Sequence, residues 1–222
     1  MKIIIPGKTL LKKCIAALLL LYCSCSDSGH EILKKKYPPK AFDGLFVSAK
    51  TALMNGMKNS GTGGFREINY GDDDRGVFVR LISNGRERGC IGFIRGVSSM
   101  DEAVKTAVID AAFFDKRYRK LGREEIPFIE IEITIIDRLV KIGDFLDFKP
   151  GIHTIYIKYL NKSAVMQGQI ALEKRHSRED FLRAVCRKAG LPETAYMERD
   201  AEIYRANTVS MRKKFADIST GM

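Results

Sequence analysis

The most regular hydrophobic pattern in the chain lies between residues 128 and 137. Isoleucine occupies every second position from 129 to 135, and Glu130, Glu132 and Thr134 stand between the isoleucines. This alternation predicts an antiparallel strand with one buried face and one solvated face. We expect Glu130 and Glu132 on the solvated face, where carboxylates serve solubility more often than acid–base catalysis or cation binding.

A second strand pattern, at 77–83, predicts a β-hairpin. It ends in Asn84-Gly85, after which the chain returns along 87–94. Asn-Gly is the strongest short signal for a two-residue hairpin turn, because both residues accept a positive φ. Further strands are expected near 65–70 and at 151–159, the latter followed by a hairpin tip at 161–163.

Three segments carry the apolar spacing of helices. Asp43 is expected to cap the first, which glycines at 56, 61, 63 and 64 end. Ser99 opens a capping box for the second, which should run to about Phe114, and Ser177 caps the third, which ends at Gly190. Strands near the middle with helices between and around them predict an α+β fold rather than repeated βαβ units.

The N-terminus has the pattern of an export signal. Four lysines come before an apolar run at 14–22, and Cys23-Ser24-Cys25 follows it. Basic residues followed by about 7–15 apolar ones are typical of a signal peptide, since a membrane span needs roughly 20. We expect lipidation at Cys25, after a small residue as in bacterial lipoproteins. Cys23, which follows bulky Tyr22, is the alternative site, and an uncleaved anchor is the alternative reading of the segment.

These patterns predict a monomeric domain held at the membrane of a bacterial cell envelope. The expected organisation is a signal peptide at 1–24, a polar tether at 25–42, a globular domain at 43–206 and a tail at 207–222. The net charge is +11, and without residues 1–24 the chain keeps 34 basic and 27 acidic residues. Anionic lipid is the expected partner for this surplus. Nucleic acid is not, because the chain has no basic stripe with interleaved aromatics.

Cysteine usage excludes a disulfide framework. After processing, Cys25 would carry lipid, and of the five cysteines only Cys90 and Cys186 would remain as free thiols. The chain has no Cys-x-x-Cys pair for zinc. We therefore expect no metal and no cofactor. We expect Cys186 to lie on the buried face of the third helix, in the core of the domain.

The segment Arg88-Gly89-Cys90-Ile91-Gly92 is the most specific motif. It resembles the Leu-Arg-Gly-Cys-Ile-Gly hallmark of the AMMECR domain family, with Glu87 in place of the leucine. Further similarities to this family lie at 110–118, 151–153, 169–171 and 186–191. The resemblance covers about 43–206 and implies a two-lobed α+β domain, with a larger, mostly antiparallel sheet flanked by helices and a smaller β lobe.

The resemblance also bears on partners. In prokaryotes, proteins of this family (AmmeMemoRadiSam system protein A) often accompany a Memo-like protein and a radical SAM enzyme. A radical SAM enzyme carries a cysteine-bound Fe–S cluster and belongs in a reducing compartment. Export of the present chain would therefore make this partnership lost or indirect.

Two functional hypotheses follow. In the preferred one, the domain binds an unknown small molecule or protein partner in a groove near 86–92 and 151–154, without turnover. In the alternative, Cys90 is the nucleophile of a small enzyme, His153 its base, and Arg88 stabilises negative charge, while Gly89 and Gly92 expose backbone N–H groups to an anion. Against the enzyme, the adjacent Glu87 would raise the pKa of the Cys90 thiol.

Overall fold

The computed structural model describes residues 28–58, 75–96 and 99–219. The expected signal peptide, the lipidation site Cys25 and the expected strand near 65–70 lie outside the described residues. Within the described part of the chain, no helix is long and apolar enough to cross a membrane.

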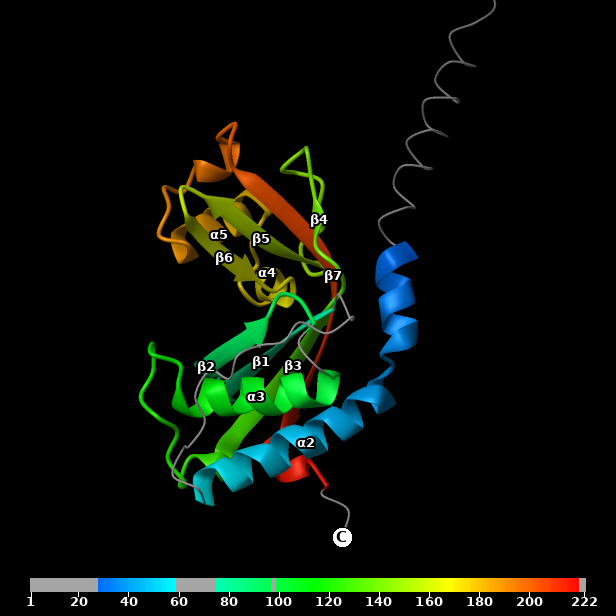
Figure 1. Ribbon diagram of the computed structural model, residues 1–222, viewed down its shortest axis with the longest axis vertical. Coiled ribbons are helices and arrows are strands. Elements are labelled where there is room, and N and C mark those ends of the chain that lie inside the picture. The colour runs from blue at the N-terminus through cyan, green and yellow to red at the C-terminus, as the bar shows by residue number, and fades with distance from the viewer. Residues whose placement is uncertain (1–27, 59–74, 97–98, 220–222) are drawn as a thin grey trace, which may run out of the picture.

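A curled antiparallel sheet runs through the whole molecule (Figure 1). Its main strands follow the order β2-β1-β3-β7-β5-β6, and β4 pairs with β7 beside this path. The strands are β1 Gly76–Ser83, β2 Arg86–Phe93, β3 Ile129–Ile136, β4 Val140–Lys141, β5 His153–Tyr159, β6 Lys162–Met166 and β7 Glu202–Lys214. Together with the helices this is the expected α+β class.

The helices lie on and beside the sheet (Figure 1). The α-helices are one at 28–36, α2 Pro39–Lys58, α3 Met100–Phe113, α4 Gln169–Glu173 and α5 Arg178–Lys188. Short 3-10 helices occur at η1 Ile126–Phe128, η2 Ala195–Met197 and η3 Phe215–Asp217. The helices α2 and α3 cover one face of β1, β2 and β3, and α4 and α5 belong to the other end of the sheet.

The larger lobe, which we call the lower lobe, contains α2, α3, β1, β2, β3 and the second half of β7. Its core fills the space between the two helices and the sheet. Phe46 and Leu53 of α2, Val108 of α3 and Ile131 and Ile133 of β3 are all fully buried there. The apolar spacing of the helices and the alternation of β3 supply this core directly.

The upper lobe contains β5, β6, the first half of β7, α4 and α5, and it has a core of its own. Phe148, Ile157, Phe181, Val185 and Tyr196 are buried together in it. The 13-residue strand β7 joins the lobes, because it pairs with β5 through Glu202 to Asn207 and with β3 through Thr208 to Lys214.

Several local predictions are confirmed. Asn84 and Gly85 form the hairpin turn with φ of 50° and 71°, as a turn with two positive φ values requires. Ser177 and Asp180 form a complete capping box at the start of α5, and Ser99 caps α3 by accepting a bond from the backbone N–H of Glu102. The cap expected at Asp43 is wrong, because α2 already begins at Pro39, whose fixed φ suits a first helical position.

The expected domain boundaries need correction at both ends. The polar tether at 25–42 is wrong from residue 28 onward, because 28–36 is a helix that inserts Leu33 into the lower core. The C-terminal tail expected from residue 207 is wrong through residue 219 as well, since 208–214 of β7 pair with β3 and Phe215 and Ile218 are buried in the lower core. The folded domain therefore extends well beyond 43–206 in both directions.

Candidate functional site

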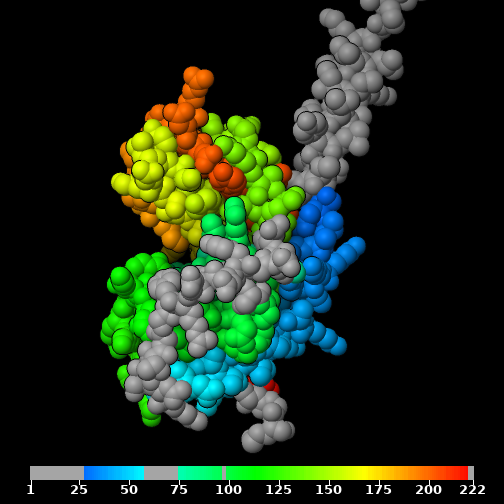
Figure 2. All heavy atoms as spheres, viewed as in Figure 1, coloured from blue at the N-terminus to red at the C-terminus, as the bar shows by residue number. Residues whose placement is uncertain are grey.

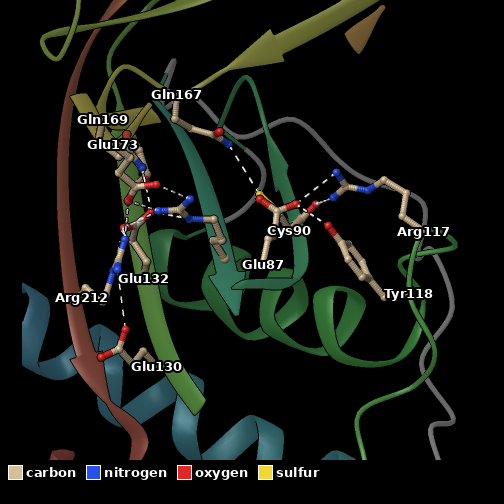
Figure 3. Close-up of polar contacts among 12 residues, drawn as sticks. Glu87, Cys90, Arg117, Tyr118, Glu130, Glu132, Gln167, Gln169, Glu173 and Arg212 are labelled. Atoms are coloured by element: carbon tan, nitrogen blue, oxygen red, sulfur yellow. Dashed lines mark hydrogen bonds and ion pairs between the residues drawn. The ribbon is translucent and has the colours of Figure 1, made fainter. Parts of the chain in front are cut away.

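A row of four functional side chains crosses the lower sheet in register. Cys90 of β2 stands opposite Arg80 of β1, Arg80 opposite Glu132 of β3, and Glu132 opposite Arg212 of β7. Residues directly opposite one another project from the same face of a sheet. This row lies on the face away from α2 and α3, and Figure 3 shows Glu132 and Arg212 beneath Gln169 and Glu173 of α4.

Glu132 holds the two arginines of the row in place. Its carboxylate accepts two bonds from Arg80, at 2.8 and 2.9 Å, and two from Arg212, at 3.1 and 2.8 Å. The solvated face expected for this strand is therefore wrong at Glu132, which is only 4% exposed. Glu130 does stand partly in solvent, 3.6 Å from Arg212. The two glutamates thus differ because only Glu132 lies under α4.

The short helix α4 brings the upper lobe onto this row. Gln169 donates to Glu132 at 2.9 Å and to the hydroxyl of Thr134 at 2.7 Å. Glu173 accepts bonds from Nη1 of Arg80 at 2.9 Å and from Nη2 at 2.5 Å, and it also pairs with Arg212. We call this group of side chains the polar junction between the two lobes (Figure 3). A small apolar cluster of Phe78, Ile136 and Ala206 also connects the lobes.

The charges at the polar junction are matched. Burial lowers the pKa of Arg80, but its bonds to Glu173 and Glu132 outweigh burial and raise the pKa above the ordinary value. For Glu173, burial raises the pKa, because it disfavours the charged carboxylate. The hydrogen bonds and charges of Arg80 and Arg212 outweigh burial, so that the pKa of Glu173 falls below its ordinary value. Arg80 and Glu173 are therefore charged at neutral pH, and the position of Glu173 favours negative charge.

Cys90 lies at the other end of the row, on an edge strand. Its backbone N–H donates to Asp115 at 2.9 Å, and its carbonyl accepts from Arg117 at 3.0 Å. These bonds protect the open edge of β2 at Cys90. The amide Nε2 of Gln167, a buried residue of the upper lobe, lies 3.8 Å from the Cys90 sulfur (Figure 3).

The surroundings of Cys90 keep its thiol protonated. Burial, followed by the nearby charge of Glu87, raises the pKa of Cys90 to about 11. Glu87 is beside the thiol because of a β-bulge: the pairing of β2 with β1 skips Arg88, so that Glu87 faces the same side as Cys90. Glu87 itself accepts a bond from the Tyr118 hydroxyl at 3.0 Å and pairs with Arg117 at 3.2 Å.

The structure does not bring Arg88 or the two glycines to the thiol. Arg88 is held by Glu125, at 2.9 Å, and by the carbonyls of Arg119 and Lys120. A Cβ on Gly89 would lie 2.0 Å from the Ala111 carbonyl of α3, and one on Gly92 would lie 2.3 Å from the Val77 carbonyl of β1. The glycines therefore allow close packing of α3 and β1 against β2.

His153 lies at the start of β5 in the upper lobe and makes its hydrogen bonds there, apart from Cys90. Its Nδ1 accepts from the backbone N–H of Lys149 at 2.9 Å, and its Nε2 lies 3.2 Å from both Asn207 and Arg205. Burial, followed by the charge of Arg205, lowers the pKa of His153 to about 4. Among the described hydrogen bonds, none joins His153 to Cys90.

Sequence reasoning missed the arginines and the α4 side chains of the polar junction. Arg80 did carry a signal, because it is the single charge within the apolar run from Val77 to Ile82. A charge in such a strand requires a buried partner. Within 28–58, 75–96 and 99–219, no group of three or more His, Cys, Asp or Glu side chains is placed to hold a metal ion.

Together these features define a two-lobed α+β domain, in which one antiparallel sheet serves both lobes and a polar junction lies between them. Residues 29–210 match the AMMECR1 family over most of the chain, and the protein belongs to that family.

Relatives in archaea support the assignment. The chain is 34% identical over 131 residues to a protein of Aeropyrum pernix and spans 57% of each sequence. It is 34% identical to a protein of Methanosarcina acetivorans, covering 60% of this chain and 68% of that one. The crystal structure of an uncharacterized protein from Pyrococcus horikoshii shares the fold, with a TM-score of 0.68, 24% identity and coverage of 77% and 90% of the two chains.

Proposed function

We propose that this AMMECR1-family protein is a lipid-anchored binding domain that holds a ligand or a protein partner where its two lobes meet. The state of Cys90 carries the proposal. Its thiol is protonated at neutral pH and lies beside an amide, Gln167, rather than a base. A cysteine nucleophile needs a depressed pKa or an adjacent base. A binding domain needs neither a depressed thiol pKa nor an adjacent base.

The meeting of the lobes offers a surface for such binding. In Figure 2 a notch separates the upper lobe, coloured yellow to orange, from the green part of the lower lobe. Polar side chains of both lobes also meet beside the polar junction, where Gln167 of the upper lobe approaches Cys90, which lies next to Glu87 in the lower lobe (Figure 3). Side chains with fixed partners in this arrangement are suited to orienting a bound molecule.

The reactivity of Cys90 tests the proposal. A pKa of about 11, against an ordinary 9.0, leaves about a hundredfold less thiolate at neutral pH. Alkylation of the full chain should therefore be slow at Cys90 and should accelerate steadily as pH rises above 9. Rates resolved at each cysteine by peptide mass spectrometry measure this, with free cysteine as the reference. Fast alkylation of Cys90 that levels off near neutral pH would establish the enzyme alternative instead.

Anchoring at the cell envelope is tested separately. The support for it is the lysine-rich start, the apolar run at 14–22 and the Ser24-Cys25 junction. Bacterial cells that express the chain and are fed a clickable fatty acid should label the protein, and Cys25→Ala should remove the label. Cys23→Ala is the matched control and should keep it. Loss of label only in the control would move the site to Cys23, and no label in any variant would exclude a lipoprotein.

A further inference from the structure

The two arginines of the polar junction converge on one carboxylate from the opposite lobe. Nη1 of Arg80 donates to Glu173, and Nη2 donates both to Glu173 and to Glu132. Arg212 donates to the same Oε1 atom of Glu173 as Nη2 of Arg80. Glu132, buried below, fixes the planes of both guanidinium groups with four hydrogen bonds. The donors are therefore oriented before anything binds to them.

Glu173 is also the member of this group that can leave. It is the last residue of the five-residue helix α4, and its side chain is 34% exposed, compared with 5% for Glu132 and 9% for Arg80. Arg212, at 37%, is open to solvent on the same side. A solvent molecule or ligand can thus approach the arginines from the side where Glu173 stands.

We propose that Arg80 and Arg212 form a binding site for an oxyanion, the carboxylate or phosphate group of a ligand, and that Glu173 occupies this site until the ligand displaces it. The inference rests on the proposed binding function and names the ligand chemistry. Paired guanidinium groups suit both anions, because each offers parallel N–H donors to two oxygens. An internal carboxylate makes the same contacts without a ligand and neutralises the positive charge that Glu132 alone leaves on the two arginines.

Displacement of Glu173 would also change how the lobes are joined. Glu173 and Gln169 both lie on α4, and both bond to groups of the lower sheet. A ligand that takes the place of Glu173 removes one of these two connections. Ligand binding is then coupled to the freedom of α4, since the ligand and the helix compete for the same donors.

The test uses the full chain in detergent, with inorganic phosphate and acetate as probes at constant ionic strength. Glu173→Ala removes the internal competitor, so phosphate should bind about tenfold more tightly than to the wild type. Glu179→Ala is the matched control, because it removes the same charge from an exposed position at the start of α5 and should leave affinity unchanged. Adding Arg212→Gln to Glu173→Ala should abolish the gain. Calorimetry with each probe shows whether the site prefers phosphate or carboxylate.

The wild-type chain provides a second measurement that does not depend on the stability of a variant. Phosphate should speed amide hydrogen exchange in α4, because it displaces Glu173 from the two arginines. The exchange rates of α5 should not change. Equal phosphate affinity of Glu173→Ala and Glu179→Ala, or unaltered exchange in α4, would overturn the oxyanion site. Fast alkylation of Cys90 would overturn the proposed function instead, so the two failures are distinguishable.

Discussion

At the scale of single residues, identical sequence signals have different physical outcomes. Glu130 and Glu132 stand two positions apart in the same alternating pattern, and the sequence treats them alike. Only Glu132 lies between two arginines and beneath Gln169, and these partners come from β1, β7 and α4. Burial of a charge depends on partners distant in sequence, so a local pattern cannot predict it.

Cys90 shows what a motif can and cannot predict. The predicted hairpin places Cys90 on a strand, as expected, and Gly89 beside it lies against α3. The sequence did not predict the β-bulge at Arg88, which turns Arg88 toward Glu125 and places Glu87 near the thiol. The bulge thus turns Arg88 away from Cys90, although the two residues are only two positions apart in the sequence.

His153 makes stability depend on pH. Its pKa is about 4 in the fold against 6.5 ordinarily, so the unfolded chain binds the proton more readily between these values. The contribution of neutral His153 is therefore complete above pH 6.5 and is lost as pH falls toward 4. Between pH 6.5 and 4, the free energy of unfolding of His153→Gln should therefore fall by about 2 kcal/mol less than that of the wild type.

Urea unfolding of the wild type and His153→Gln at several pH values measures this effect. The free energy of unfolding of the wild type should fall more steeply on acidification than that of the variant. Parallel curves for the two proteins would mean that His153 is protonated as easily in the fold as in the unfolded chain.

At the scale of elements, the sequence predicted what is locally encoded. The Asn84-Gly85 hairpin and the Ser177 cap follow from residues adjacent in the chain, and both are present. The strand β7 was missed because its burial does not alternate: one lobe covers its first half and the other lobe its second. The helix at 28–36 was missed because Leu33 is its one buried apolar residue and its lysines surround it in the sequence.

The strand β3 offers a direct comparison of a buried and an exposed charge. Glu132→Ala leaves the buried Arg80 without its main partner, so we expect a loss of about 3–5 kcal/mol in the free energy of unfolding. Glu130→Ala on the same face removes only a 3.6 Å contact with partly exposed Arg212 and should cost less than about 1 kcal/mol.

Thermal and urea unfolding of both variants decide the matter, with circular dichroism as the check that each is folded. Similar losses in the two variants would show that Glu132 is not energetically different from its exposed neighbour. A large loss in Glu132→Ala alone supports the polar junction as a buried ionic network.

At the scale of the whole molecule, β7 is the strand that the two lobes share. It pairs with β3 in the lower lobe and with β5 in the upper lobe, and Arg212 near its end completes the polar junction. The two main cores are separate clusters, and the lobes are held together by this strand, by the contacts of α4 and by a small apolar cluster of Phe78, Ile136 and Ala206. A two-lobed fold was predictable from the family resemblance, whereas a strand common to both lobes was not.

The length of chain required for folding tests this role of β7. A chain ending at residue 206, the boundary expected from sequence alone, lacks the half of β7 that pairs with β3, and it loses buried Phe215 and Ile218. We expect it to show no cooperative unfolding transition, because β3 becomes an open edge and the lower core is exposed to water. A chain ending at residue 219 keeps all of these groups and should unfold like the full protein. Calorimetry of the two truncated chains makes the comparison, and a cooperative transition in the shorter one would show that the lower lobe folds without β7.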